Sequence, residues 1–233
     1  MVDIITVTAD NVDDYGFFCK MSARKSPAWQ AKRDWLMARF AEGLQMRLLG
    51  DGERGFIEFM PGPKSWRAVD DVNDFVVIHC LWVVGKSRGR GFARDLVAEA
   101  EAWARDNGYY GVAALTSRGN WLIAPGIVEH LGFRRVDTCG DKFELWVKSH
   151  SAHKVPRSCG GWARKAEACG PGVTVLRSAQ CPYLDEAAAR VRTVATELGL
   201  PYREIMLESA DDDELADPDW LERFRAAALS MPE

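Results

Sequence analysis

A short run of glycines and cations between a β-type segment and a helix-type segment constrains this chain most. The β-branched, apolar run Phe75–Val84 ends directly before Gly85, and the apolar stripe of a helix begins at Phe92. Glycines allow tight turns and bring backbone N–H groups close to an anion, while a helix N-terminus adds free donors and partial positive charge. The sequence therefore predicts a phosphate-binding turn between strand and helix.

The cations of this turn are Lys86, Arg88 and Arg90, in a chain whose net charge is −4. Affinity for nucleic acid comes largely from many clustered Lys and Arg residues. We therefore expect a local anion site and no nucleic-acid partner. The glycine spacing fits neither the dinucleotide fingerprint G-x-G-x-x-G near a first strand nor the phosphate loop G-x-x-x-x-G-K-[ST].

Length and composition limit the class of protein. With 233 residues, 47% of them hydrophobic and 27% charged, the chain can build the core of one large domain, or of one domain with a smaller partner. Its apolar runs are far shorter than the ~20 residues of a membrane helix, and Met1–Asp10 is typical of a strand rather than a leader. We expect a cytoplasmic protein with no membrane contact and six reduced cysteines. We also expect no metal, because no two Cys or His residues have structural-zinc spacing.

Periodicity predicts an α+β domain over residues 1–148. Strands are expected over Ile4–Thr8, Gln45–Leu49, Gly55–Met60, Phe75–Val84, Val112–Thr116, Phe133–Asp137 and Lys142–Lys148. Helices are expected over Asp13–Ser22, Ala28–Gly43, from Phe92 to Asn107-Gly108, and over Pro125–Leu131. The segment Gly50-Asp51-Gly52 indicates a hairpin between the second and third strands.

The composition changes over residues 149–172, which are rich in Ser, His, Pro and Gly and are expected to form a linker or an irregular crossing. Residues 173–233 follow as a partial second module. Its βαβ unit comprises the expected strand Val173–Ser178, helix Leu184–Leu198 and strand Tyr202–Glu208. A short amphipathic helix is expected from about Pro218. Two parallel strands are not stable alone, so the module should pack on the first domain or on another subunit, which leaves a homodimer open.

The segment Lys86-Ser87-Arg88-Gly89-Arg90-Gly91 resembles the Gln/Arg-x-x-Gly-x-Gly/Ala motif of the GNAT acyltransferases, with Lys86 in the first place. The order of expected elements over residues 3–148 also matches that family. Gly132-Phe133 resembles the Gly-Phe that closes its second helical motif. The phrases Phe56–Pro61 and Ile78–Val84, with a C-terminal thioredoxin-like module, are similar to the YoaP-type branch. The resemblance implies a mixed, mostly antiparallel sheet flanked by helices.

The resemblance further implies an acetyl-CoA-dependent N-acetyltransferase that acetylates an amine, or another nucleophile, of a small-molecule acceptor. Backbone N–H groups near Leu81–Val83 would stabilise the developing oxyanion. The implied cofactor-binding residues are Leu81, Trp82, Val83, Val84, Lys86, Ser87, Arg88, Gly89, Arg90, Gly91, Phe92, Ala93 and Asn120. A catalytically weak CoA-binding regulatory protein is the alternative.

The family usually carries a Tyr as general acid four residues before the Gly of Gly-Phe, and here that position is Val128. Ser117, Asn120 or His130 could take its place, although His130 also fits a surface helix residue. A thiol whose pKa is near the ~8.5 of free Cys leaves readily as thiolate, so loss of the acid weakens catalysis without forbidding it.

Two residues are candidates for the general base. Glu58 lies inside the apolar strand Phe56–Met60, either as a carboxylate with a raised pKa or as part of an exposed strand face. His79 alternates with Val77 and Leu81, and could be a base or a hydrogen-bonded core histidine.

The second module contains Cys181-Pro182-Tyr183-Leu184, which resembles the Cys-Pro-Tyr-Cys site of glutaredoxins with Leu184 in place of the second cysteine. A helix N-terminus stabilises a thiolate. Cys181 could therefore be a redox or substrate-holding thiol in a thiol-handling protein, or part of a vestigial scaffold.

Overall fold

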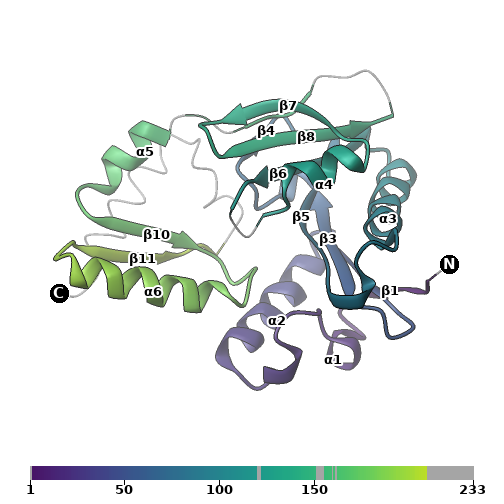
Figure 1. Cartoon of the computed structure of the whole chain (residues 1–233), viewed down its shortest axis with the longest axis horizontal. Coiled ribbons are helices and arrows are strands. Elements are labelled where there is room, and N and C mark those ends of the chain that lie inside the picture. The colour runs from purple at the N-terminus through teal and green to yellow at the C-terminus, as the bar shows by residue number, and fades with distance from the viewer. Residues whose placement is uncertain (1, 120–121, 151–154, 159, 161, 209–233) are drawn as a thin grey trace.

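The structure is a computed structural model that describes residues 2–119, 122–150, 155–158, 160 and 162–208 (Figure 1). Asn120 and the helix expected from Pro218 lie outside these residues. The main sheet has the strand order β1-β2-β3-β5-β6-β8-β7. Its strands are β1 (Ile4–Val7), β2 (Gln45–Leu49), β3 (Gly55–Pro61), β5 (Phe75–Val83), β6 (Gly111–Ser117), β7 (Arg134–Cys139) and β8 (Phe143–Ser149). Within this sheet, β5 and β6 are the one parallel pair among the described strands, so the expected mixed, mostly antiparallel sheet is confirmed.

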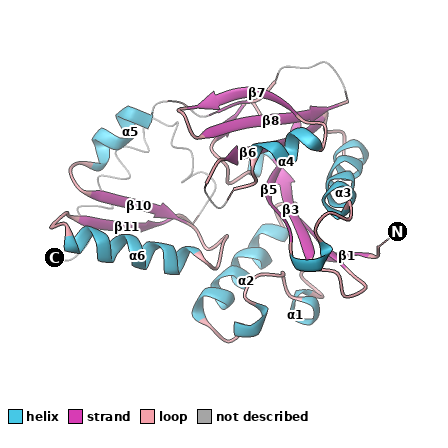
Figure 2. Cartoon of the chain, viewed as in Figure 1, coloured by secondary structure: helices cyan, strands magenta, loops and turns pink. Residues whose placement is uncertain are grey.

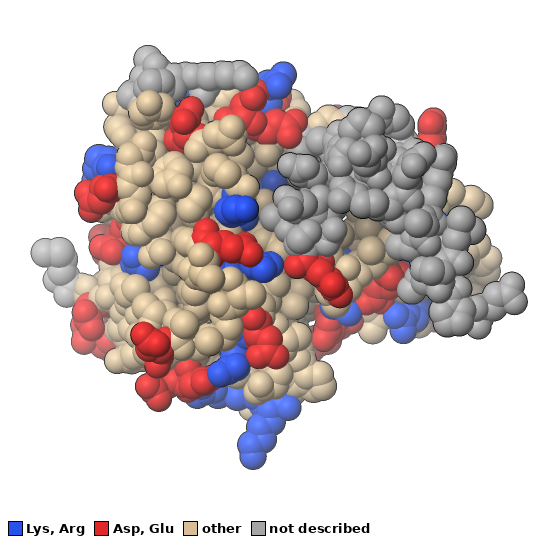
Figure 3. All heavy atoms as spheres, turned by 180° about the vertical axis from the view of Figure 1, so that it is seen from behind, with Lys and Arg blue, Asp and Glu red and all other residues tan. Residues whose placement is uncertain are grey.

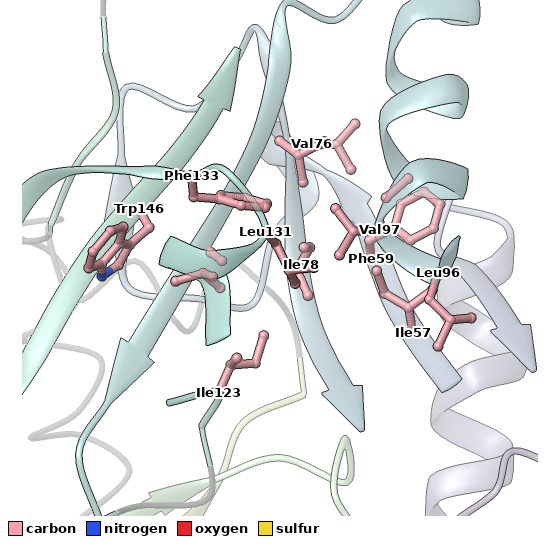
Figure 4. Close-up of a cluster of buried hydrophobic side chains, with 14 of the residues drawn as sticks. Ile57, Phe59, Val76, Ile78, Leu96, Val97, Ile123, Leu131, Phe133 and Trp146 are labelled. Atoms are coloured by element: carbon pink, nitrogen blue, oxygen red, sulfur yellow. The ribbon is translucent and has the colours of Figure 1, made fainter. Parts of the chain in front are cut away.

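Helices cover both faces of this sheet (Figure 2). On one face lie α3 (Phe92–Asp106) and α4 (Pro125–His130), and α2 (Pro27–Phe40) covers the other. Figure 4 shows Leu96 and Val97 of α3 directed at Phe59 of β3. These residues belong to one buried cluster, so the amphipathic stripe predicted for this helix forms the core that holds its N-terminus against the sheet.

The first predicted helix is wrong. Only α1 (Val12–Tyr15) is helical, and a single 3-10 turn follows at Met21–Ala23. The helix is interrupted because Gly16 ends α1 with a φ of 71°. Phe18 and Lys20 also have positive φ values, of 75° and 49°. This irregular segment carries Phe17 and Cys19 into the core on the α2 side.

β5 and β6 separate halfway along. Their parallel register ends at Ile78 opposite Ala114, whereas β5 continues to Val83. On its other side β5 stays paired with β3, and the register shifts beside Glu58 so that His79 is an extra residue in β5. Such a bulge bends a strand and redirects its side chains. From His79 onward, the edge of β5 that faces β6 has no strand partner in the described part of the chain.

The predicted βαβ unit is confirmed near the C-terminus. β10 (Val173–Arg177) and β11 (Tyr202–Met206) pair in parallel, with α6 (Leu184–Glu197) between them. The stretch 149–172 holds α5 (Trp162–Cys169) and β9 (Arg157–Ser158), and β9 pairs with β4 (Val69–Asp70). Its role as a linker stays a prediction. The thioredoxin-like resemblance of the unit stays a prediction.

The described surface carries both signs of charge. Figure 3 shows acidic and basic side chains interspersed over one face. Some are paired, as Arg177 is with Asp185 and Glu204 at 2.6 and 2.5 Å. In the described ranges, no helix combines the length and apolarity needed to cross a bilayer.

Candidate active site

The glycine turn after β5 has a backbone that only glycine adopts readily. Gly85, Gly89 and Gly91 have φ values of 60°, 73° and 88°, and Gly91 is the N-cap of α3. A Cβ atom at any of them would meet nothing within 4 Å. These glycines therefore serve the backbone conformation and leave the space in front of the turn open.

This turn presents unpaired donors at a helix N-terminus. Among the described residues, no backbone carbonyl accepts a hydrogen bond from the amides of Gly89, Arg90 or Gly91. The first N–H groups of α3, at Phe92 and Ala93, are free by helix geometry. An anion in front of the turn would meet these donors together with the positive end of the helix dipole.

Ser87 ties this turn to the β2–β3 hairpin. Its hydroxyl is buried, accepts a hydrogen bond from the Arg54 amide (2.9 Å) and donates one to Oε2 of Glu53 (2.8 Å). Oε1 of Glu53 pairs with Arg90 at 2.6 Å, and the Ser87 hydrogen bond and the Arg90 pair lower the pKa of Glu53. The Ser87 side chain therefore positions the turn, and Arg90 is partly neutralised.

A cavity of about 1170 Å³ begins at this turn and extends along the half-paired end of β5. Its floor includes Leu81, Trp82 and Val83. One wall comes from α4 and the segment before it, with Ile123, Ile127 and His130 among its residues. The far end is lined by Cys19, His79, Cys80, Cys181 and Tyr183. The structure therefore brings together the phosphate-type turn, a strand edge that has no strand partner among the described residues, and the predicted thiol of the second module.

Glu58 is neither exposed nor a free base. It is 1% exposed, and its Oε2 atom lies 2.5 Å from Nζ of Lys32 in α2. Its Oε1 atom accepts a hydrogen bond of 3.0 Å from Gln180. Burial by itself would raise the pKa of Glu58, but the Lys32 charge and the interactions with His79 together outweigh burial and hold this pKa below its usual range. The predicted raised pKa and the exposed-face alternative are both wrong.

His79 is a buried, hydrogen-bonded histidine that lines the cavity. Its Nε2 atom accepts a hydrogen bond from the Trp66 amide (3.2 Å), so the ring proton resides on Nδ1, which lies 3.7 Å from Oε1 of Glu58. Burial lowers the pKa of His79 to about 4. The ring is therefore neutral at neutral pH, with its one lone pair already engaged, as expected for a core histidine.

The candidates for the general acid separate in space. Val128, which holds the position of the usual Tyr, belongs to α4 and is fully buried in the core. Ser117 is also buried, lies outside the cavity lining, and its hydroxyl has no hydrogen-bond partner among the described residues. His130 is exposed and lines the cavity, which makes it the candidate that can reach a bound ligand.

Sequence reasoning missed two residues of this site, Lys32 and Gln180. Lys32 had a signal, because it falls between Trp29 and Leu36 on the apolar face of a predicted helix. Gln180 had none beyond its place next to Cys181, because only the tertiary fold brings it to Glu58.

A second hollow of about 660 Å³ lies beyond the start of α4. It is lined by charged residues, including Glu144, which faces Arg118 and Arg135 at 3.6 and 3.7 Å. Neither the glycine turn nor the end of β5 contributes to it. The chemistry predicted from the sequence therefore belongs to the larger cavity.

A phosphate-type turn that feeds a cavity along a half-paired strand of a mixed sheet is the arrangement of an acyltransferase. The model of the acetyltransferase (GNAT) family matches residues 15–133, and the chain belongs to this family. The family predicted from the glycine turn and the order of elements is confirmed.

The chain is also similar to individual proteins. The chain is 26% identical over 219 residues to the uncharacterized N-acetyltransferase YoaP of Bacillus subtilis strain 168. The matched region covers 93% of this chain and 87% of that protein. It is similar to yncA of Salmonella typhimurium, solved with acetyl-CoA, at 16% identity over 68% of this chain and 99% of that one, with a TM-score of 0.46. It is also similar to YhbS, a GNAT family N-acetyltransferase of Escherichia coli solved with CoA, at 18% identity over 67% and 89%, with a TM-score of 0.41.

Proposed function

We propose that this chain transfers an acetyl group from acetyl-CoA to an amine of a small-molecule acceptor. The observation that carries this proposal is the single cavity that joins the free amides of the Gly89–Ala93 turn to the opened end of β5 and reaches Cys181. The turn suits the pyrophosphate, and the strand edge suits the amide-containing arm of the coenzyme, which needs main-chain partners.

Acetyl transfer requires hydrogen-bond donors for the carbonyl oxygen and a correct orientation of the amine toward the thioester. The amine nitrogen attacks the thioester carbonyl, the C–N bond forms as the C–S bond breaks, and the sulfur leaves with its electron pair. The nitrogen proton passes to solvent. Main-chain N–H groups near Leu81–Val83 would stabilise the negative charge that develops on the carbonyl oxygen. Because Val128 cannot donate a proton, the sulfur leaves as thiolate or takes a proton from His130 at the cavity wall.

Calorimetric titration with CoA and an assay of free-thiol release from acetyl-CoA test this proposal. We expect CoA to bind, and thiol release to depend on an added amine. Absence of both binding heat and amine-dependent release would contradict the proposal. Binding without release for any amine would favour the regulatory alternative, in which the fold has lost turnover.

The thiol-handling alternative makes a different prediction for Cys181. If acetyl transfer proceeds by direct attack, Cys181→Ser retains most of the amine-dependent thiol release. If the thiol carries the reaction, Cys181→Ser abolishes activity, whereas Cys169→Ser, a half-buried cysteine outside the cavity, leaves it unchanged.

A further inference from the structure

The C-terminal unit is held against the first domain by specific contacts around one loop, residues 178–183. Lys20 pairs with Glu186 at 2.6 Å and lies 5.2 Å from the centre of the Tyr183 ring. Leu176, Ala179, Tyr183 and Ile205 pack against the core on the α2 side, and Leu207 is part of it. The loop between β10 and α6 is therefore fixed at the far end of the cavity.

Gln180 makes the deepest of these contacts. Its side-chain amide donates a hydrogen bond of 3.0 Å to Oε1 of Glu58, whose other oxygen is already paired with Lys32. A buried carboxylate needs partners for both oxygens, because leaving a buried polar atom without a hydrogen bond destabilises the fold. The need of Glu58 for a second partner thus fixes where residues 178–183 lie.

The chemistry of the far end is aromatic and sulfur-rich. Cys19, Cys80 and Cys181 line it together with Trp82 and Tyr183. Trp82 keeps 37% of its surface exposed although it lies in the central strand β5, so its ring offers a surface for a ligand. Near this end Glu58 pairs with Lys32 and Glu186 pairs with Lys20, so no carboxylate among these is left without a cation. Arg67 donates a hydrogen bond to the His79 carbonyl, and the His79 ring is uncharged.

We infer that residues 178–183 form the acceptor-selecting wall of the active site, with Gln180 as the positioning residue and Tyr183 and Cys181 as acceptor contacts. The acceptor class that fits is a small, flat amine that is uncharged at neutral pH, such as an arylamine. A charged acceptor would lose hydration against aromatic and thiol groups without gaining a partner, whereas a flat ring gains contact with Trp82 and Tyr183. This inference rests on the proposed acetyl transfer and adds the acceptor class and the residues that select it.

The experiment uses the full chain with acetyl-CoA and three amines: aniline, the wider 2-naphthylamine, and the charged aliphatic diamine putrescine. We expect kcat/KM for aniline to exceed that for putrescine by about tenfold or more. Tyr183→Ala should widen the end of the cavity and raise the ratio of 2-naphthylamine to aniline, and Cys181→Phe should lower that ratio. Tyr15→Ala, an exposed tyrosine of α1, is the control and should leave the ratio unchanged.

Gln180→Ala should lower kcat/KM for aniline about tenfold while the KM for acetyl-CoA stays unchanged. Gln30→Ala, an exposed glutamine of α2, is its control. If residues 178–183 had only a structural role, a substitution there would change kcat/KM equally for all acceptors. A changed ratio of kcat/KM between 2-naphthylamine and aniline would therefore show that these residues contact the acceptor. If CoA binds but neither Tyr183→Ala nor Cys181→Phe moves the ratio, or putrescine is preferred, the inference fails alone. If CoA does not bind, the proposed function fails, and the inference with it.

Discussion

Lys32 in α2 and Glu58 in β3 form an ion pair behind the cavity, with Nζ 2.5 Å from Oε2 and neither side chain more than 3% exposed. Two charges taken out of water are tolerated only while they face each other and their other polar atoms are satisfied. Gln180 completes that set at Oε1. This carboxylate is therefore a structural group that joins α2, β3 and the C-terminal unit.

Glu58→Gln should lower the free energy of unfolding by about 3–5 kcal/mol, because it leaves the Lys32 ammonium buried without its partner. Urea unfolding followed by tryptophan fluorescence measures this change, and Lys32→Met in the same chain should recover part of it. Asp13→Asn is the matched control. Asp13 of α1 pairs with Arg33 of α2, the helix that carries Lys32, but Asp13 is exposed, so its loss should cost below about 1 kcal/mol. Full stability of Glu58→Gln with loss of all acetyl transfer would instead make Glu58 the base.

The buried state of His79 predicts a pH dependence of stability. Its pKa falls from 6.5 to about 4 on folding, so the unfolded chain binds more protons between these values and stability declines as pH decreases from about 6.5 to about 4. Above pH 6.5 the stability that depends on the neutral ring is fully present. His79→Gln, which keeps an acceptor for the Trp66 amide, should reduce the slope of unfolding free energy against pH in this window.

Catalysis supplies the second readout for His79. Because the His79 ring is uncharged around pH 7, its titration should not affect catalysis. The pH profile of kcat should therefore be the same near pH 6.5 in the unmodified chain and in His79→Gln. An inflection there that is lost in the variant would show that His79 titrates as the base.

The glycine turn and the order of elements along the chain could be predicted from the sequence because both rest on local patterns. The β-branched run predicts β5, the glycines predict the turn, and the apolar stripe predicts α3, each with its approximate ends. The early helix failed for a local reason of another kind. Phe18 and Lys20 adopt left-handed backbone conformations that no pattern of apolar residues signals.

The state of Glu58 could not be predicted because it depends on residues distant in the sequence. Alternation correctly placed Glu58 on the face of β3 opposite Ile57. Whether that face is exposed to water or buried in the core depends on α2 and on residues 176–207, which cover it. The bulge at His79 also needs the pairing of two strands before it exists. Burial and pKa therefore follow from tertiary contacts, and only the lysine on the apolar face of α2 hinted at them.

Ser87→Ala should weaken the binding of CoA without removing the fold. The change leaves the Arg54 amide and Glu53 Oε2 without the hydroxyl that joins them, and it loosens the turn against the hairpin. We expect the KM for acetyl-CoA to rise by about fivefold to tenfold, which corresponds to about 1 kcal/mol for a lost hydrogen bond, and kcat to change little. Ser26→Ala removes an N-cap hydroxyl at α2, away from the cavity, and should lower stability without raising this KM.

The strongest test of the turn compares two glycines that have similar positive φ values. Gly91, at the start of α3, has a φ of 88°, and Gly108, just past its end, has a φ of 80°; a Cβ at either would meet nothing within 4 Å. Replacing either by Glu should cost roughly 1–2 kcal/mol of stability through the left-handed backbone. Only Gly91→Glu places a carboxylate in the cavity where the phosphates are expected, so calorimetry should show CoA affinity reduced at least about tenfold there and retained in Gly108→Glu. Equal CoA affinity in the two variants would mean that the turn does not hold the phosphates.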